Sequence, residues 1–132
     1  MSATLAVVAT RLREDGGLLA AALVEADAAP TPHGDAVGRR FAVAVEAIRE
    51  GYLLHYGASR LLAVDADRDL ALLAGDRLYA LGLAELAAIG DLRAVRAMAA
   101  VIARGAAAQA AGDAAAAEEA WATGTRTLAL DR

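Results

Sequence analysis

The stretch of residues 70–91 reads LALLAGDRLYALGLAELAAIGD and decides the fold class. Leucine and alanine, both strong helix formers, dominate it, and it contains no proline. Its apolar residues fall on nearly all sides of a 3.6-residue period, as is typical of a helix with neighbours on several faces. The segment Asp65-Ala66-Asp67 can cap its start, and Gly90 can end it. We therefore predict a central helix that ends at Gly90.

Two glycines interrupt the leucines and alanines of this helix. Gly75 and Gly82 are seven residues apart, so they share one face. A face without side chains lets a neighbouring helix come close. We predict an interhelical distance at the short end of the usual range of about 8–10 Å.

A glycine followed by an aspartate occurs at two places where one helix is predicted to end and the next to begin. Asp91 follows Gly90, and Asp113 follows Gly112, so each pair predicts the end of one helix and the start of the next. The last helix is predicted to open at Asp113 and to run through Trp121, which anchors it. A less regular tail is predicted from Thr123, and Leu128 and Leu130 could still dock from it.

The first part of the chain is divided by prolines and glycines. Ala3–Arg13 and Leu18–Ala28 both have helical patterns, and Gly16-Gly17 separates them. Residues 29–35, with Pro30 and Pro32, are predicted to be a linker. A long helix is predicted to start at Asp35 as its N-cap and to run past Tyr56.

These elements predict one all-α domain over residues 1–132. It contains an N-terminal helix or helix pair (1–28), the linker (29–35) and a main body (36–132). We expect about five Ala-rich helices in an antiparallel bundle, because alanine supplies roughly 30% of the residues. No strand pattern is long enough to compete.

Composition excludes several kinds of chemistry. The chain has no cysteine and two histidines, His33 and His55, so we expect no metal site and no cofactor. The net charge is −4, and arginines are interspersed with acidic residues, so we expect no nucleic-acid partner.

The apolar start, Met1 to Thr10, lacks the basic residues of a targeting signal, and Glu85 interrupts the apolar run Leu78–Gly90. We predict a cytoplasmic protein without a membrane span.

Polar residues of the helix before the central one fall mostly on one side. Arg39, Arg40, Glu46, Arg49 and Glu50 fall mostly opposite the apolar stripe. His55 lies on the apolar stripe, which favours a hydrogen-bonded core or interface histidine over a catalytic one.

The central helix carries one acidic residue in its first half. Asp76 needs a partner if it is buried, and Arg60 or Tyr52 of the neighbouring helix is the expected one. Three tyrosines of the two helices could converge, either to line a pocket or to fill the core. The candidate pocket or interface residues are Glu46, Tyr52, His55, Tyr56, Arg60, Asp76 and Tyr79, and no residue is predicted to be catalytic.

Four segments between Glu46 and Gln109 follow a known family pattern. They are Glu46-Ala-Ile-Arg-Glu-Gly-Tyr-Leu-Leu-His55-Tyr, Leu73-Ala-Gly-Asp76-Arg-Leu-Tyr-Ala80, Gly90-Asp-Leu, and Ile102-Ala-Arg-Gly105-Ala-Ala-Ala-Gln109. Together they resemble the middle of the polyprenyl synthetase (isoprenyl diphosphate synthase) family, over about half of the chain. The best match is Leu73–Ala80. The resemblance implies a helical fold and a prenyl-sized apolar groove.

The departures from that family concern its chemistry. Family members hold magnesium through clusters of aspartates, because hard cations prefer several carboxylate oxygens. At the matching place this chain has Leu54-His55-Tyr56-Gly57, without an aspartate pair. Gly105-Ala106 stands where the family has Gly-Glu. The resemblance therefore implies a fold without synthase activity.

Without synthase activity, the function that the resemblance implies is association with another protein chain. Members of the family work as dimers, and some pair a catalytic chain with a short non-catalytic one. A short chain whose helices are apolar on nearly all sides also favours a dimer, because it has more apolar surface than it can bury alone. The leading hypothesis is therefore a non-catalytic protein that forms a homodimer, or a heteromer with a catalytic subunit, and that holds an apolar isoprenoid-like molecule.

Two other interpretations remain open. Residues 112–121 resemble the second half of a tetratricopeptide repeat, which would indicate a protein-interaction scaffold, although an array needs a period near 34 residues. Arg49 and His55 resemble the Arg-x(4–6)-His motif of HEPN-type ribonucleases, in which histidine moves the proton and arginine stabilises the developing charge.

Overall fold

The computed structural model describes residues 3–25 and 29–130, and within them the chain forms seven helices. The prediction of an all-α fold is confirmed. The count exceeds five because residues 1–28 contain two helices, α1 and α2, and because the segment predicted as linker forms part of a further short helix, α3. The helices are α1 (Ala3–Asp15), α2 (Gly17–Ala21), α3 (Pro32–Val37), α4 (Arg39–Tyr56), α5 (Arg68–Ile89), α6 (Leu92–Ala110) and α7 (Ala114–Leu130).

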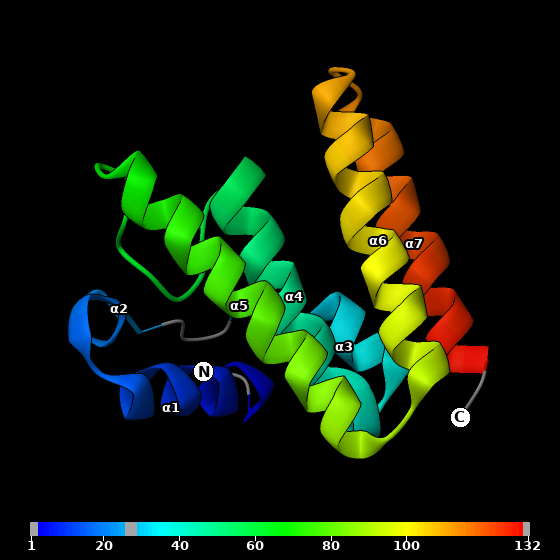
Figure 1. Ribbon diagram of the computed structural model, residues 1–132, viewed down its shortest axis with the longest axis horizontal. Coiled ribbons are helices and arrows are strands. Elements are labelled where there is room, and N and C mark those ends of the chain that lie inside the picture. The colour runs from blue at the N-terminus through cyan, green and yellow to red at the C-terminus, as the bar shows by residue number, and fades with distance from the viewer. Residues whose placement is uncertain (1–2, 26–28, 131–132) are drawn as a thin grey trace.

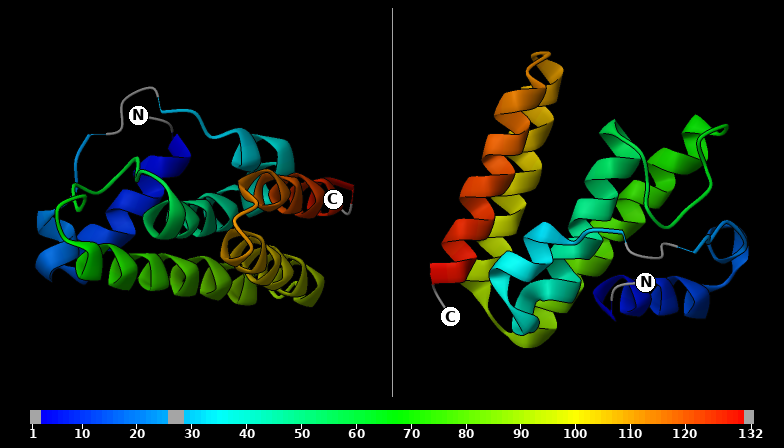
Figure 2. Two further views of the ribbon diagram at one scale, coloured as in Figure 1. Left: turned by 90° about the horizontal axis from the view of Figure 1, so that it is seen from above. Right: turned by 180° about the vertical axis from the view of Figure 1, so that it is seen from behind.

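Helix α4, and not α5, occupies the centre. It contacts α1, α3, α5 and α6, while α6 and α7 form an antiparallel hairpin that leans away from α4 and α5 (Figure 1). The left panel of Figure 2 shows α5 and α6 on one side of the molecule and α3 on the opposite side. The prediction that residues 70–90 form the central helix is therefore wrong. Its outer face is uncovered, and Leu73 is 67% exposed there.

Helices α4 and α5 meet at glycines, as predicted. A Cβ atom placed on Gly82 would lie 2.7 Å from the carbonyl oxygen of Ala44 and 2.5 Å from Cγ1 of Ile48. A Cβ atom on Gly51 would lie 2.9 Å from the carbonyl oxygen of Gly75. The two backbones are thus in direct contact, and they leave no space between them for a side chain.

The caps of the two long helices follow the sequence. The side chain of Asp67 accepts a hydrogen bond from the backbone N–H of Leu70 at 3.0 Å, and α5 begins there. Gly90 ends α5 in the left-handed conformation (φ 85°, ψ 18°), which other residues rarely adopt. The side chain of Asp91 then accepts from the N–H of Ala94 at 3.0 Å and opens α6.

The Asp67 cap gives a first testable prediction. Asp67→Ala should lower the free energy of unfolding by about 1 kcal/mol, because it removes the acceptor for an otherwise unpaired helix N–H. Urea denaturation followed by circular dichroism measures this loss. Asp65→Ala is the matched control, because Asp65 is also exposed and lies two residues earlier. Equal losses in the two variants would contradict the assigned cap.

The start of α4 differs from the prediction. Asp35 lies inside the short helix α3, whose first residue is Pro32, a favourable position for proline. Gly38 is the N-cap of α4. The segment predicted as linker is therefore partly helical. In the N-terminal part, the predicted helix Leu18–Ala28 is helical only to Ala21, and its last residues, 26–28, lie outside the described residues.

The last helix is longer than predicted. Instead of ending near Trp121, α7 continues to Leu130. Threonine hydroxyls donate back to carbonyls of the preceding turn, from Thr125 to Trp121 at 2.9 Å and from Thr127 to Thr123 at 3.0 Å. These bonds satisfy the hydroxyls within the helix. Leu128 docks in the core as expected, whereas the side chain of Leu130 lies outside the described residues.

The hydrophobic core consists of two clusters. The first lies between α1, α4, α5 and the loop of residues 57–67, and the second lies between α3, α4, α6, α7 and the later part of α5, which contributes Leu86. Leu5, Val8, Leu12, Leu54, Leu61 and Leu78 belong to the first cluster; Phe41, Val45, Ile48, Met98, Trp121 and Leu128 belong to the second.

Candidate functional site

The predicted site residues gather around α4, but in two separate groups. Glu46 and Arg60 meet on the side that α3 and the loop of residues 57–67 cover. The remaining five lie near the junction of α4 and α5, where aromatic rings touch. These five residues are Tyr52, His55, Tyr56, Asp76 and Tyr79.

The first group is a buried ion network, formed by Glu46, Glu50 and Arg60. Glu50 accepts three hydrogen bonds: from Oγ of Ser59 at 2.6 Å, from the backbone N–H of Arg60 at 3.0 Å and from Nε of Arg60 at 2.8 Å. Glu46 accepts from the N–H of Gly34 at 2.7 Å, and its Oε1 lies 2.7 Å from Nη1 of Arg60. The network thereby ties α3 and the loop to α4.

Glu46 and Glu50, on the polar side of the helix, both have fully buried side chains. They lie four residues apart on one helical face, and the loop returns Arg60 to them. The expectation that Arg60 or Tyr52 pairs with Asp76 is wrong, because Arg60 pairs with the two carboxylates of the network and Asp76 lies against His55. The feature of the sequence that could have indicated the role of Glu50 is its position four residues after Glu46, on the same helix face.

Arg49 connects α4 to α7. Its guanidinium lies 4.9 Å from the ring centre of Tyr52 and 5.1 Å from that of Trp121, and its Nη2 donates to Glu118 at 2.9 Å. Such cation–π contacts stabilise an arginine that is mostly shielded from water. The sequence did not indicate this contact, because Trp121 is distant in the chain.

A pocket opens beside Arg49 and Arg60. It has a volume of about 170 Å³ and is lined by Pro30, Pro32, His33, Arg49, Leu53 and Arg60; we call it the arginine pocket. The ring of His33 lies 5.1 Å from that of Trp121. Burial lowers the pKa of His33 below its usual value, and the positive charge of Arg49 lowers it further. His33 is therefore neutral at pH 7. No sequence pattern singled out this residue.

The second group is an aromatic cluster, and the expected convergence of the three tyrosines is confirmed. Tyr52 and Tyr56 lie 5.1 Å apart, His55 lies 5.7 Å from Tyr56, and His55 stacks on Tyr79 at 5.2 Å, measured between ring centres. The hydroxyl of Tyr52 accepts a hydrogen bond from Gln109 at 2.7 Å, which joins α4 to α6. Burial raises the pKa of Tyr79 well above its usual value, and Tyr56 and Tyr52 add to the shift.

Asp76 lies at the edge of the aromatic cluster. Its side chain is 70% exposed, and its Oδ1 lies 3.1 Å from Nε2 of His55. The two groups form an ion pair when the imidazole is protonated. Asp76 is thus not the buried carboxylate that the apolar surroundings in the sequence suggested, because it projects from the uncovered face of α5.

The two residues of the ribonuclease interpretation have different neighbours. Arg49 contacts Tyr52, Trp121 and Glu118, whereas His55 contacts Tyr79 and Asp76. Six residues along a helix correspond to a rotation of roughly 240°, which separates their directions. Within one chain, this geometry does not place both groups against a common reacting atom.

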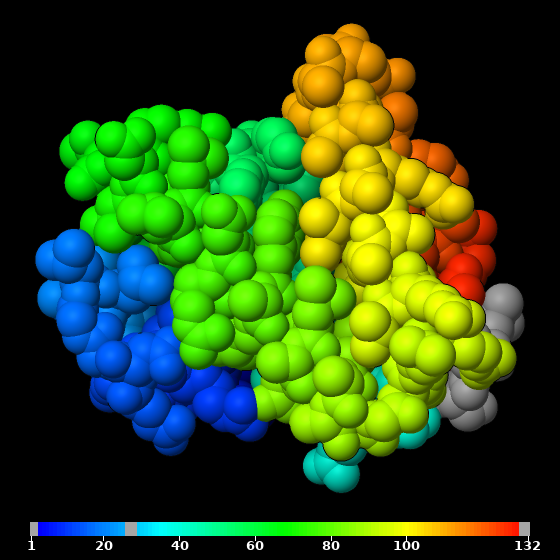
Figure 3. Space-filling model, viewed as in Figure 1, coloured from blue at the N-terminus to red at the C-terminus, as the bar shows by residue number. Residues whose placement is uncertain are grey.

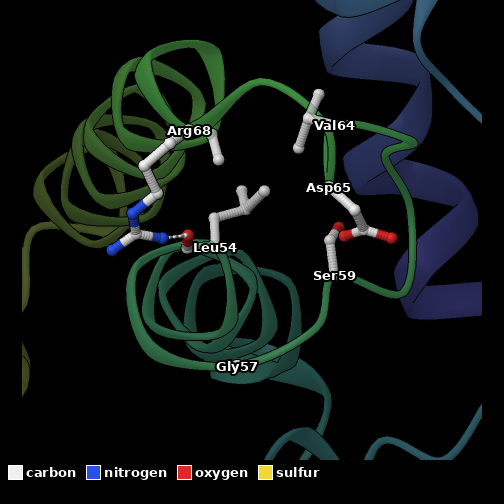
Figure 4. A pocket seen from close by; sticks show the side chains of 7 residues that line it. Leu54, Gly57, Ser59, Val64, Asp65 and Arg68 are labelled. Carbon is white, nitrogen blue, oxygen red and sulfur yellow. Dashed lines mark hydrogen bonds between the residues drawn. The ribbon is translucent and has the colours of Figure 1, made fainter.

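A second cavity lies between the end of α4 and the start of α5. It has a volume of about 110 Å³, and Leu54 and Val64 point into it (Figure 4). Ser59 and Asp65 lie on the loop side, while Arg68 turns along α4 and donates to the carbonyl oxygen of Leu54 at 3.3 Å. Because the hydroxyl of Ser59 already donates a hydrogen bond to Glu50, we interpret this cavity as part of the contact that holds the loop of residues 57–67 against α4.

For the described part of the chain, metal sites, membrane-spanning helices and known relatives give no further indication of function. Among residues 3–25 and 29–130, no group of three or more histidine or acidic side chains could hold a metal ion. None of the helices in this part of the chain is both long and apolar enough to cross a membrane. No protein-family model, curated protein or solved structure matches the chain.

Proposed function

We propose that the protein is a non-catalytic partner subunit, which acts by binding a second copy of itself or a catalytic protein chain. The observation that carries this proposal is an apolar strip along the outer face of α5. The strip continues into the first turn of α6. It consists of Leu73, Ala80, Ala84, Ala87 and Leu92, all of them exposed, and we call it the α5 strip.

The spacing of these residues defines a continuous surface. Steps of seven, four and three residues keep Leu73 to Ala87 on one side of the helix, over roughly 21 Å. Leu73 is 67% exposed and Leu92 is 60% exposed. A groove of about 330 Å³, mostly apolar, lies beside Leu92. Figure 3 shows α5 and α6 together on this face of the molecule.

An exposed leucine among exposed alanines on one helix face, next to a second exposed leucine, is a reason to expect a partner. A helix face that stays in water normally carries charged residues, and contiguous apolar surface marks an interaction site. Arg77 lies on the same helix face between Leu73 and Ala80, where it pairs with Asp15, and Asp76 lies beside the α5 strip. An apolar centre with a polar rim is the usual composition of a protein–protein interface.

The resemblance of residues 46–109 to polyprenyl synthetases suggests which class of protein the partner belongs to. In that family, a short non-catalytic chain can accompany a catalytic one, and the present chain lacks the aspartates of the acidic motif at residues 54–57. We therefore propose a prenyl-transferring chain as the heteromeric partner. A tetratricopeptide-like scaffold is the alternative, and it would use the same α5 strip with an unrelated partner.

The contact between α4 and α5 argues against one part of the initial hypothesis. The backbones meet at Gly51, Gly75 and Gly82, so an isoprenoid chain has no room between these two helices. Ligand pockets for molecules of drug size usually enclose about 300–1,000 Å³. The cavity at the end of α4 and α5 has only about 110 Å³. The proposal therefore does not include an apolar ligand in this place.

Self-association gives the most direct test. Purified wild-type protein at tens of micromolar should be dimeric by light scattering, and Leu73→Glu combined with Leu92→Glu should make it monomeric. Each glutamate would have to lose its hydration on entering the interface, which is costly without a paired cation.

The matched control is Leu18→Glu. Leu18 is 73% exposed and lies in α2, outside the α5 strip. This variant should keep the wild-type mass. A monomeric wild type would rule out the homodimer, and equal dissociation by Leu18→Glu would show that the α5 strip is not the interface.

Two further experiments separate the remaining alternatives. Incubation of the purified chain with magnesium and with allylic and homoallylic diphosphates should give no product; efficient product formation would refute a non-catalytic role. Gentle purification from the native host should retain a prenyl-transferring chain in stoichiometric amount. A stoichiometric partner of another class would favour the scaffold alternative.

A further inference from the structure

The arginine pocket contains hydrogen-bond donors that the protein does not use. Nη1 of Arg49 and Nη2 of Arg60 are buried, and neither has a hydrogen-bond partner among residues 3–25 and 29–130. Each of these nitrogens carries two N–H groups. A buried donor without an acceptor costs free energy, so such donors are usually paired in a folded protein.

Most acceptors close to these donors are already engaged. Both oxygens of Glu50 accept hydrogen bonds, one from Ser59 and the other from Arg60. Oε2 of Glu46 accepts from Gly34, and Oε1 of Glu118 accepts from Nη2 of Arg49. Oε1 of Glu46 pairs with Nη1 of Arg60 at 2.7 Å but forms no hydrogen bond within the described residues. None of these carboxylates accepts from Nη1 of Arg49 or from Nη2 of Arg60.

We infer that the arginine pocket binds a small oxyanion, either a phosphate or a carboxylate. Two guanidinium groups line the pocket, and each has one nitrogen left that can donate to an oxygen of the anion. The volume of about 170 Å³ fits a small anion better than a large substrate. This inference is independent of the proposed association function.

The walls of the pocket restrict what can enter. Pro30, Pro32 and Leu53 are apolar, so they exclude strongly hydrated cations and favour a compact ligand with few polar groups outside its anionic head. The ring of His33 completes the wall and is neutral at pH 7. Because the three nearby carboxylates outnumber the two arginines, the formal charge of the group is slightly negative. Anion binding therefore depends on the two unpaired donor nitrogens, and we expect a dissociation constant of roughly 1 mM or weaker.

Trp121 provides the readout for binding. It is the only tryptophan of the chain, and both Arg49 and His33 lie about 5.1 Å from its ring. Titration with sodium phosphate or with sodium acetate, at constant ionic strength, should change its fluorescence in a saturable way and raise the melting temperature. Saturation by one anion alone would identify that anion as the source, and saturation by both would indicate a general oxyanion site.

Variants of Arg49 test the assignment. Arg49→Lys keeps the charge but removes the unpaired Nη1 donor, so the dissociation constant should rise at least tenfold; Arg49→Gln should have a larger effect. Arg104→Gln is the matched control, because Arg104 is exposed on α6 and does not line the pocket. Circular dichroism verifies that each variant is folded. Absence of saturation with both anions, or unchanged affinity in folded Arg49→Lys, would overturn the inference.

Discussion

Replacement of Glu50 by alanine is expected to lower the free energy of unfolding by about 3–5 kcal/mol, because it leaves the buried guanidinium of Arg60 without a partner for its Nε. The same change removes the acceptor for Oγ of Ser59 and for the backbone N–H of Arg60. Each donor left unpaired and buried adds to the loss. Urea denaturation at one protein concentration measures the effect.

The control for this prediction is Glu119→Ala. Glu119 is exposed on α7, and its removal should change stability by less than about 0.5 kcal/mol. A double variant, Glu50→Ala with Arg60→Ala, tests the cause. It should lose less than the sum of the two single losses, because the charge that Glu50→Ala strands is then absent. Additive losses would show that Glu50 and Arg60 stabilise the fold independently.

A second large effect is expected at the contact between α4 and α5. Gly82→Ala should destabilise the protein by about 2 kcal/mol, although alanine is the better helix former. The new Cβ atom would lie 2.7 Å from the carbonyl oxygen of Ala44, and a backbone atom cannot move aside without shifting α4. The overpacking cost therefore exceeds the gain in helix propensity of about 1 kcal/mol.

Gly105→Ala provides the matched comparison. Gly105 lies inside α6, but a Cβ atom there would be 3.6 Å from the ring of Tyr52, an ordinary van der Waals distance. This variant should be neutral or more stable by up to about 1 kcal/mol. If both substitutions stabilise the protein equally, the close approach at Gly82 is not a constraint on the fold.

The helix boundaries that sequence could predict are those with local causes. Asp67, Gly90 and Asp91 act within one helical turn, so the limits of α5 and the start of α6 were correct. The spacing of Gly75 and Gly82 likewise fixed which face of α5 meets α4. These features depend on backbone conformation and on near neighbours, which a single sequence displays.

The charged residues of α4 show what sequence could not display. Glu46 and Glu50 have the pattern of a solvated face, but α3 and the loop of residues 57–67 cover them. That cover depends on where Gly34 and Arg60 arrive in space, and no local periodicity encodes this. Of the candidate site, the aromatic cluster was foreseeable from helical spacing, whereas the arginine pocket was not.

The opposite error concerned α5. Its leucines have the pattern of a fully surrounded helix, yet Leu73 lies on an open face. Hydrophobicity shows that a residue favours burial but does not identify the chain that buries it. The sequence was thus correct about the apolar character of α5 and wrong about its place in the fold, and the proposed association accounts for the difference.

The division of the core into two clusters has a consequence for the opening of the native state. Helix α1 belongs to one cluster and the α6–α7 hairpin to the other, and α4 contributes to both. Amide hydrogen exchange should therefore resolve two cooperative units of unequal stability. Amides of α1 should exchange without exposure of those of α6 and α7, while the amides in the middle of α4 should exchange last, through global unfolding.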